Sequence, residues 1–298
     1  MRSRRITSPF PIDVSRTLWP LRRGTGDPTM RVGRREVVRA SRTPDGPATA
    51  RLVQAPGAIE VEAWGPGAGW LLEHAPAWVG ALDDDTGFDP PPGLVRELWR
   101  RHRGVRIPRT GLVTERLIPV ILEQKVTGPE ARRTYRRLAT ALAERAPGPL
   151  GLALPPDPER VAELPYQAFH PFGIERRRAE VLRTVCARAA WLDAAAALPL
   201  DQERARLGAI RGIGPWSIAE VARTALGDAD AVSVGDYHVP SIVTWALARE
   251  PRGTDERMLE LLEPFRPHRG RVQRLLMVGH VRAPAFGPRM EARAIDRL

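Results

Sequence analysis

The sequence changes its pattern at residues 82–92, and this change limits the possible folds more than any other feature. The segment contains three consecutive aspartates, residues 83–85, and three consecutive prolines, residues 90–92. Consecutive prolines suit neither a helix interior nor a central strand. We therefore expect a boundary near residue 90 between two differently built parts of the chain.

Before this boundary the pattern favours strands. Short apolar runs near residues 36–40, 51–54 and 59–64 are separated by turn-forming stretches such as residues 43–47. These runs predict a small antiparallel sheet accompanied by one helix.

After the boundary, apolar residues recur at helical spacing. Helices are expected near residues 94–103, 115–126, 129–145, 175–190, 200–209, 215–226, 237–248, 254–263 and 269–278. The predicted class is α+β. A small β-rich N-terminal domain with its linker covers residues 1–90, an all-α domain covers 91–282, and a basic tail that is ordered only in part covers 283–298.

The charge balance indicates a polyanionic partner. The chain carries a formal net charge of +11 and a pI of about 11.1, and basic side chains bind phosphates with release of condensed counterions. Lys125 is the only lysine among the 46 basic residues. A GC-rich genome produces abundant arginine without selection for function. The ammonium group of Lys125 is therefore more informative about function than the many guanidinium groups.

Several classes of site are excluded by composition. Cys186 is the only cysteine, which excludes an internal disulfide and any four-cysteine zinc or iron–sulfur site, and core packing is its expected role. The histidines have no metal-ligand spacing, so no catalytic metal is expected. No stretch reaches the roughly 20 apolar residues of a membrane-spanning helix, and residues 1–10 lead into no apolar run, so a soluble cytoplasmic protein is expected.

Residues 207–226 read LGAIRGIGPWSIAEVARTAL, which predicts two helices joined by a tight turn at Gly212 and Gly214. Glycines allow backbone N–H groups to point toward a phosphate, the following helix start adds the positive end of its dipole, and Ile213 anchors the turn in the core. An ordinary helix–helix turn has the same pattern, so this motif alone is compatible with both uses.

Asp236 stands further along, directly before a helix that has Pro240 in its first turn. An aspartate there is most often a plain N-cap. With the turn, however, four segments resemble the helix-hairpin-helix DNA glycosylases, and among them the 3-methyladenine DNA glycosylase II type. They are LIPVILEQKVTG at 117–128, IRGIGPW at 210–216, VGDYHV at 234–239 and RPHRGRVQRLL at 266–276.

The resemblance covers nearly the whole chain and implies roles for individual residues. Asp236 would be the catalytic carboxylate, facing the sugar of a nucleotide rotated out of the duplex. Positive charge develops on that sugar as the glycosidic bond breaks, so a fixed carboxylate can stabilise it and orient or deprotonate water. The DNA-binding hairpin would comprise Arg211, Gly212, Ile213 and Gly214.

Trp216 and Tyr237 match pocket positions of the family, where an indole face would attract a cationic purine. Core packing is the alternative for both side chains. Trp216 also stands where glycosylases that cleave the DNA backbone have a lysine that forms a Schiff base. The resemblance therefore implies a monofunctional enzyme.

Gln124 and Lys125 match the place where the family inserts a side chain into the gap left by the flipped base. Lys125 departs from the apolar version, but its stem could fill the gap while its ammonium meets a phosphate. A surface lysine at a helix end is the alternative. Glu220 lies one turn after Trp216 and would contact the base or pair with Arg223, the second use being favoured.

Two arginine runs are either solvated faces or phosphate contacts: Arg132, Arg133, Arg136 and Arg137, and Arg266, Arg269, Arg271 and Arg274.

The expected function is excision of alkylated purines of the 3-methyladenine and 7-methylguanine type from double-stranded DNA. The protein would act as a nucleoid-associated monomer, with no cofactor beyond a monovalent cation that some relatives bind at the hairpin. Two alternatives stay open: a non-catalytic protein of the same fold that binds damaged DNA, and a glycosylase for deaminated or oxidised bases.

Overall fold

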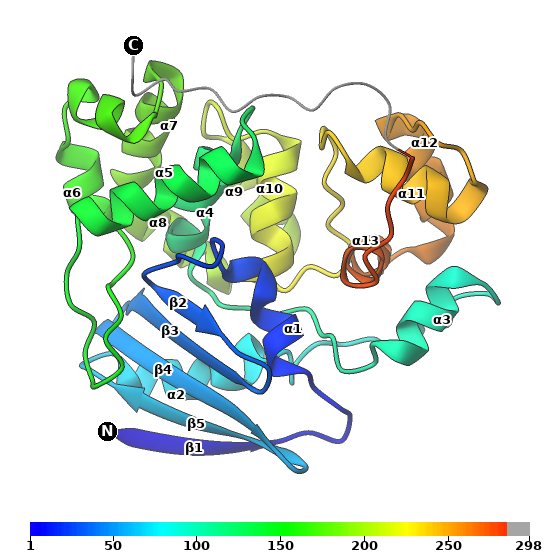
Figure 1. Ribbon diagram of the computed structural model, residues 1–298, viewed down its shortest axis with the longest axis horizontal. Coiled ribbons are helices and arrows are strands. Elements are labelled where there is room, and N and C mark those ends of the chain that lie inside the picture. Colours follow the sequence, from blue (N-terminus) through cyan, green and yellow to red (C-terminus); the bar gives the residue numbers. More distant parts are fainter. Residues whose placement is uncertain (285–298) are drawn as a thin grey trace.

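A computed structural model describes residues 1–284 of the chain, with an antiparallel sheet on one side and helices stacked over it and beside it (Figure 1). This arrangement belongs to the α+β class, as predicted. Most of the expected basic tail, residues 285–298, lies outside the described residues.

The sheet has five antiparallel strands in the order β1-β5-β4-β3-β2. Their bounds are β1 Arg2–Thr7, β2 Met30–Val32, β3 Glu36–Thr43, β4 Gly46–Ala55 and β5 Ala58–Trp64. The three predicted apolar runs fall in β3, β4 and β5. Strands β1 and β2 were not predicted, and in β1 only Ile6 is buried, because an edge strand in contact with solvent carries little apolar signal.

One face of the sheet is covered by helices α1 (Val14–Leu18) and α2 (Ala68–Trp78), which share a core with it. Leu52 and Val61 from the sheet and Leu71 from α2 are completely buried there. Trp78 at the end of α2 is also buried, and its indole N–H donates to the Thr110 carbonyl at 2.9 Å. That bond joins the sheet layer to the chain that leads into the central helices.

A second core surrounds helix α4 (Val113–Glu123), in which Leu117 and Ile121 are fully buried. Cys186 is buried in this core, as expected. The predicted helix at 215–226 ends as an α-helix at Val221 and continues as a π-helical turn, Ala222–Leu226. The other helices here are α5 Gly128–Ala141, α6 Pro158–Glu163, α7 Arg176–Cys186, α8 Ala189–Asp193, α9 Leu200–Gly208 and α10 Pro215–Val221.

A third core unites α3 (Leu94–Arg101) with the last helices of the described chain, although α3 is distant from them in sequence (Figure 1). These helices are α11 Val239–Ala248, α12 Asp255–Leu262 and α13 Arg269–Val278. The chain passes from the second core to the third through residues 227–238. Asp236 therefore lies at the junction of two helical bodies.

The acidic and proline-rich segment is firmly attached to both sides. The side chain of Asp83 is only 2% exposed, accepts two hydrogen bonds of 2.8 Å from Arg271, and lies 3.2 Å from Nε of Arg106. Phe88 of the same segment is buried in the third core. This segment connects the sheet side to α13 through buried charges.

Candidate active site

The predicted hairpin is present between α9 and α10, and its geometry requires a glycine at position 212. Gly212 has φ +95°, and a Cβ atom there would lie 2.4 Å from a methyl carbon of Val181. Ile213 is 5% exposed and packs in the second core. Gly214 precedes α10 with open space where a Cβ would be, and Arg211 is exposed. The turn is thus anchored from inside and open on its outer side, the condition for backbone contact with a ligand.

Gln124 holds this hairpin to the end of α4. Its side-chain amide donates to the Gly212 carbonyl at 3.0 Å and to the Ser217 hydroxyl at 2.9 Å. Lys125 follows with φ +54°, in the left-handed region, and its side chain is exposed. The two residues predicted to insert into DNA are therefore differently placed: Gln124 is committed to hydrogen bonds with the hairpin, and Lys125 projects beside it.

Asp236 lies in a short loop whose shape is fixed on three sides. Ser233 exchanges two hydrogen bonds with the Gln273 side chain, from its backbone N–H at 3.1 Å and to its hydroxyl at 2.9 Å. Gly235, at φ +86°, donates its N–H to both carboxylate oxygens of Asp255 at 3.0 and 3.1 Å. The Asp236 N–H closes the turn on the Ser233 carbonyl. A glycine is needed at 235 because L side chains rarely adopt this φ.

The Asp236 carboxylate bridges the hairpin helix and the next helix. Its Oδ1 accepts the backbone N–H groups of His238 at 2.8 Å and Val239 at 3.0 Å, and so caps the backbone that leads into α11, whose N-cap residue is His238. Its Oδ2 accepts the indole N–H of Trp216 at 3.0 Å. The bond from Trp216 is additional to the two capping bonds, so the carboxylate joins the start of α10 to the start of α11.

The two predicted aromatic residues differ in burial. Trp216 is half-buried and packs against the second core. Tyr237 is 88% exposed and meets the His238 ring edge to face. Core packing, the alternative for Tyr237, is therefore wrong, since this side chain touches no core. Tyr237 stands at the surface directly beside Asp236.

The expected pairing of Glu220 with Arg223 is confirmed, and Glu220 has two further partners that the sequence did not predict. Its carboxylate accepts from Arg223, from Arg116 at 3.0 Å and from the Ser233 hydroxyl at 2.8 Å. Burial would raise the pKa of Glu220, but Arg223 and Arg116 outweigh burial and lower it to about 2. Glu220 thus links α10, α4 and the loop that carries Asp236.

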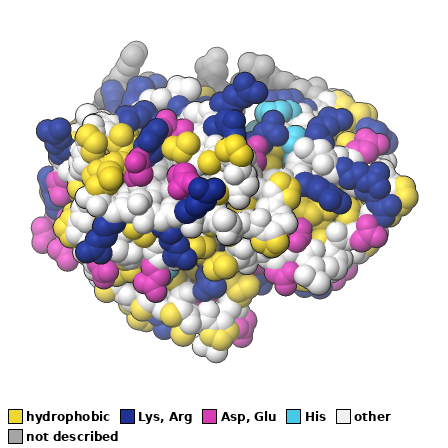
Figure 2. Space-filling view, turned by 90° about the horizontal axis from the view of Figure 1, so that it is seen from below, with side chains coloured by type: hydrophobic (Ala, Val, Ile, Leu, Met, Phe, Trp, Pro, Cys, Tyr) yellow, Lys and Arg dark blue, Asp and Glu magenta, His cyan; other side chains and the backbone are white. Residues whose placement is uncertain are grey.

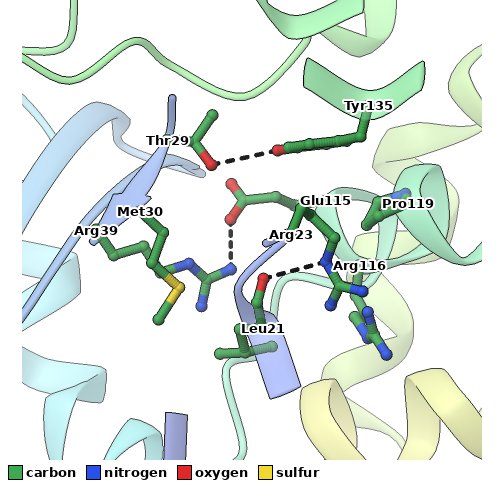
Figure 3. Close-up of a pocket in the computed structure, with 9 residues that line it drawn as sticks. All are labelled: Leu21, Arg23, Thr29, Met30, Arg39, Glu115, Arg116, Pro119 and Tyr135. Atoms are coloured by element: carbon green, nitrogen blue, oxygen red, sulfur yellow. Dashed lines mark hydrogen bonds and ion pairs between the residues drawn. The ribbon is translucent and has the colours of Figure 1, made fainter. Parts of the chain in front are cut away.

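A small polar cavity lies elsewhere, between the sheet and α4 (Figure 3). Its volume of about 20 Å³ is that of roughly one water molecule. Glu115 accepts from Arg39 there at 2.6 Å, and Arg39 and Arg116 each retain one buried Nη1 without a hydrogen-bond partner among the described residues. This cavity contains none of the residues proposed for base excision.

The two predicted arginine runs have different surroundings. Arg132, Arg133 and Arg136 on α5 are exposed. On α13 the opposite holds: Arg271 is 1% exposed and bound to Asp83, and Arg269 binds Asp230 at 2.6 Å. The prediction of phosphate contact is therefore wrong for Arg271, because the buried Asp83 carboxylate occupies its guanidinium group.

Within residues 1–284, no group of three or more His, Cys, Asp or Glu side chains is arranged to hold a metal ion. None of the helices in that part of the chain is long and apolar enough to cross a membrane.

No family model and no curated protein sequence matches the chain. Solved structures do. The 3-methyladenine DNA glycosylase from Archaeoglobus fulgidus matches with a TM-score of 0.78 at 16% identity, over 93% of this chain and 98% of its own. The 8-oxoguanine glycosylase/lyase from Clostridium acetobutylicum matches with a TM-score of 0.69 at 12% identity, over 93% and 96%.

A third structure, the 3-methyladenine DNA glycosylase Mag1 of Schizosaccharomyces pombe in complex with abasic DNA, matches with a TM-score of 0.51 at 17% identity, over 67% of this chain and 96% of its own. At these identities the likeness concerns the fold. The chain has the fold of the helix-hairpin-helix DNA glycosylases, the family that its four sequence segments resemble.

Proposed function

We propose that this protein is a base-excision repair DNA glycosylase that hydrolyses the N-glycosidic bond of a damaged nucleotide in double-stranded DNA. The observation that carries the proposal is the Asp236 carboxylate, which three N–H donors hold between the hairpin helix α10 and the start of α11. A carboxylate fixed beside a DNA-binding turn matches what the chemistry needs, because rigid positioning removes the cost of reorganising the site during reaction.

In the proposed reaction the flipped nucleotide presents its sugar to Asp236. The bond from C1′ to the base nitrogen breaks, and its electron pair leaves with the base. Positive charge then develops on the sugar, where the carboxylate stabilises it, and a water molecule adds to C1′ as its proton passes to the carboxylate. A positioned acid–base group of this kind contributes about 10²- to 10⁴-fold to the rate.

Alkylated purines are the proposed substrates, and hydrolysis alone is the proposed chemistry. A base that is cationic through alkylation leaves without a strong general acid, and the half-buried Trp216 offers an indole face beside the carboxylate. Trp216 occupies the position at which a Schiff-base lysine would stand in a bifunctional enzyme. The sole lysine, Lys125, is instead placed beside the hairpin.

A glycosylase for oxidised bases is the second candidate. The 8-oxoguanine glycosylase/lyase of Clostridium acetobutylicum shares this fold over nearly the same length as the Archaeoglobus enzyme does. The fold alone therefore does not choose between these substrates, and a comparison of lesions is needed.

The deciding experiment measures release of free bases from methylated duplex DNA and from duplexes with one oxidised or deaminated base. We expect release of methylated purines by the parent and a loss of about 10²- to 10⁴-fold in Asp236→Asn, in which an amide retains one capping oxygen but carries no charge. Asp255→Asn is the matched control, because it changes a neighbouring carboxylate that holds the loop through Gly235.

The outcomes separate the candidates. Release from the oxidised duplex alone would establish the second candidate, and binding without release from any duplex would favour a damage-binding protein. Covalent trapping by borohydride would overturn the monofunctional proposal. Equal losses in Asp236→Asn and Asp255→Asn would mean that Asp236 acts only through the loop structure.

Double-stranded DNA containing damaged bases is the proposed partner, and the protein is proposed to act on it as a nucleoid-associated cytoplasmic monomer. No cofactor is proposed beyond a monovalent cation at the hairpin. Exchange of potassium for a bulky organic cation during DNA binding would test that ion, since loss of a cation at residues 212–214 would weaken the hairpin contact selectively.

A further inference from the structure

A hollow of about 210 Å³ lies between the loop at residues 24–26 and the first turns of α5. The loop belongs to the sheet side of the molecule and α5 to the helical side, so the two parts build the hollow together (Figure 1). It is lined by Arg23, Gly24, Thr25, Gly26, Pro129, Arg132, Arg133 and Arg136.

The arginines lie tightly against the glycines of the loop. A Cβ atom on Gly24, which has φ +85°, would stand 2.6 Å from Cδ of Arg132, and one on Gly26 would stand 2.9 Å from Nη1 of Arg136. Arg132 also reaches back to the helix start, because its Nη1 lies 3.1 Å from the Cβ position of Gly128. The loop therefore fits around these side chains, which line the hollow together with it.

Three of the four arginines that line the hollow have no carboxylate partner among the described residues. Among residues 1–284, Arg132, Arg133 and Arg136 form no ion pair, and no Asp or Glu lines the hollow. Arg23 at its edge is paired with Glu123. Unpaired guanidinium groups in a concave site attract a phosphate, which they can bind through several N–H donors at once.

Several other arginines near the surface have carboxylate partners. On the underside of the molecule basic and acidic side chains are interspersed (Figure 2). The outer strands show the same mixing, with Arg5 near Glu60 at 3.1 Å and Arg51 between Glu36 and Glu62. The hollow differs from these paired sites because no Asp or Glu lines it.

We propose that this hollow binds a phosphodiester group of the DNA backbone, which makes the N-terminal part of the chain a direct contributor to DNA binding. The proposal rests on the proposed function, since it assigns a further backbone contact to the same DNA. Helix α5 begins at Gly128, three residues beyond the exposed Lys125, and Gln124 ties Lys125 to the hairpin. The hairpin, Lys125 and the first turn of α5 are thus linked by this bond and by a short stretch of chain.

The test adds a negative charge to the hollow without removing any packing. Thr25 is exposed, so Thr25→Glu places a carboxylate among the three arginines, and Thr7→Glu makes the same change at an exposed position of edge strand β1. Affinity for a lesion-free 20-base-pair duplex is measured by fluorescence anisotropy from about 50 to 200 mM salt. Lesion-free DNA keeps the readout independent of catalysis.

We expect Thr25→Glu to weaken binding about tenfold at low salt and to reduce the slope of log K against log salt by about one, as for one lost phosphate contact. Thr7→Glu is expected to change affinity by less than about twofold. Equal effects of the two variants on affinity, or an unchanged salt slope in Thr25→Glu, would overturn the phosphate site. The proposed function would stand in that case if the parent released bases. A parent that binds no duplex would overturn both.

Discussion

The two arginine runs, on α5 and on α13, look alike in the sequence but differ in the fold in their exposure to solvent and in their acidic partners. On α5, Arg132 and Arg133 project into solvent without acidic partners among the described residues. On α13, Arg269 and Arg271 are bound by Asp230 and Asp83. The density of positive charge is similar in both runs. What differs is the supply of carboxylates from other parts of the chain.

This comparison explains the role of the acidic segment that precedes the predicted boundary. Asp83 is buried between Arg106 and Arg271, and Asp85 pairs with Arg106 at 2.9 Å. These aspartates neutralise arginines that the fold has taken out of water, where an unpaired charge would be very costly. Arg132, Arg133 and Arg136 of α5 have no such requirement, because they stay exposed to solvent.

The largest expected effect follows from removal of the buried partner. Asp83→Asn leaves Arg106 and Arg271 without their shared carboxylate, so we expect the free energy of unfolding to fall by about 3–5 kcal/mol. Asp84→Asn, at an exposed neighbouring position, is the matched control and should cost less than about 1 kcal/mol. Urea denaturation measures the free energy of unfolding of both variants. Similar losses in the two would mean that the buried arginines do not depend on Asp83 for stability.

The second prediction concerns pH and Glu220. Because the folded-state pKa of about 2 lies below the unfolded value near 4.5, the ionised carboxylate stabilises the fold above pH 4.5. This contribution, about 2–3 kcal/mol, is lost as pH falls from 4.5 to 2. Glu220→Gln should therefore be less stable than the parent at pH 7, and the difference should shrink across that window. A constant difference would mean that Arg116 and Arg223 do not depend on this charge.

Local relations were predictable from the sequence. The hairpin turn, the three central strands and the pairing of Glu220 with Arg223 depend on residues close together in the chain, where periodicity, glycine and helical i, i+3 spacing carry the signal. Asp236 was predicted as a site residue from the resemblance of its segment VGDYHV to the family, and its role stays a prediction. Its bond from Trp216 joins two predicted site residues that the pattern alone could not place side by side.

Distant relations were not predictable. The bonds from Arg116 to Glu220 and from Gln124 to Gly212 join residues about a hundred positions apart, and Arg271 reaches Asp83 across a still longer separation. Such pairs form only when the cores pack, and the spacing of residues within one short segment does not predict which distant residues will meet. For this reason one arginine run could not be distinguished from the other before the fold was known.

The third prediction addresses the α5 run itself. Replacement of Arg132, Arg133 and Arg136 together by glutamine should reduce affinity for duplex DNA about 100-fold at low salt and lower the salt slope by about two to three. Stability should change by less than about 1 kcal/mol, since these side chains have no buried partner to lose. Unchanged affinity in a folded triple variant would place DNA binding elsewhere on the protein.

The smallest effect is expected at Arg266, the one residue of the α13 run that is still largely open to solvent, with 53% of its side chain exposed. It pairs with Glu263 at 2.9 Å, and an exposed pair of this kind stabilises a protein by no more than about 1 kcal/mol. Arg266→Ala should therefore shift stability by less than about 0.5 kcal/mol and DNA affinity by less than twofold, because Glu263 already neutralises the charge. Urea denaturation and fluorescence anisotropy measure the two quantities. A tenfold loss of DNA affinity would show that an arginine with a carboxylate partner still binds phosphate. The difference in DNA binding between the two runs would then depend on the burial of the arginines and not on their ion pairs.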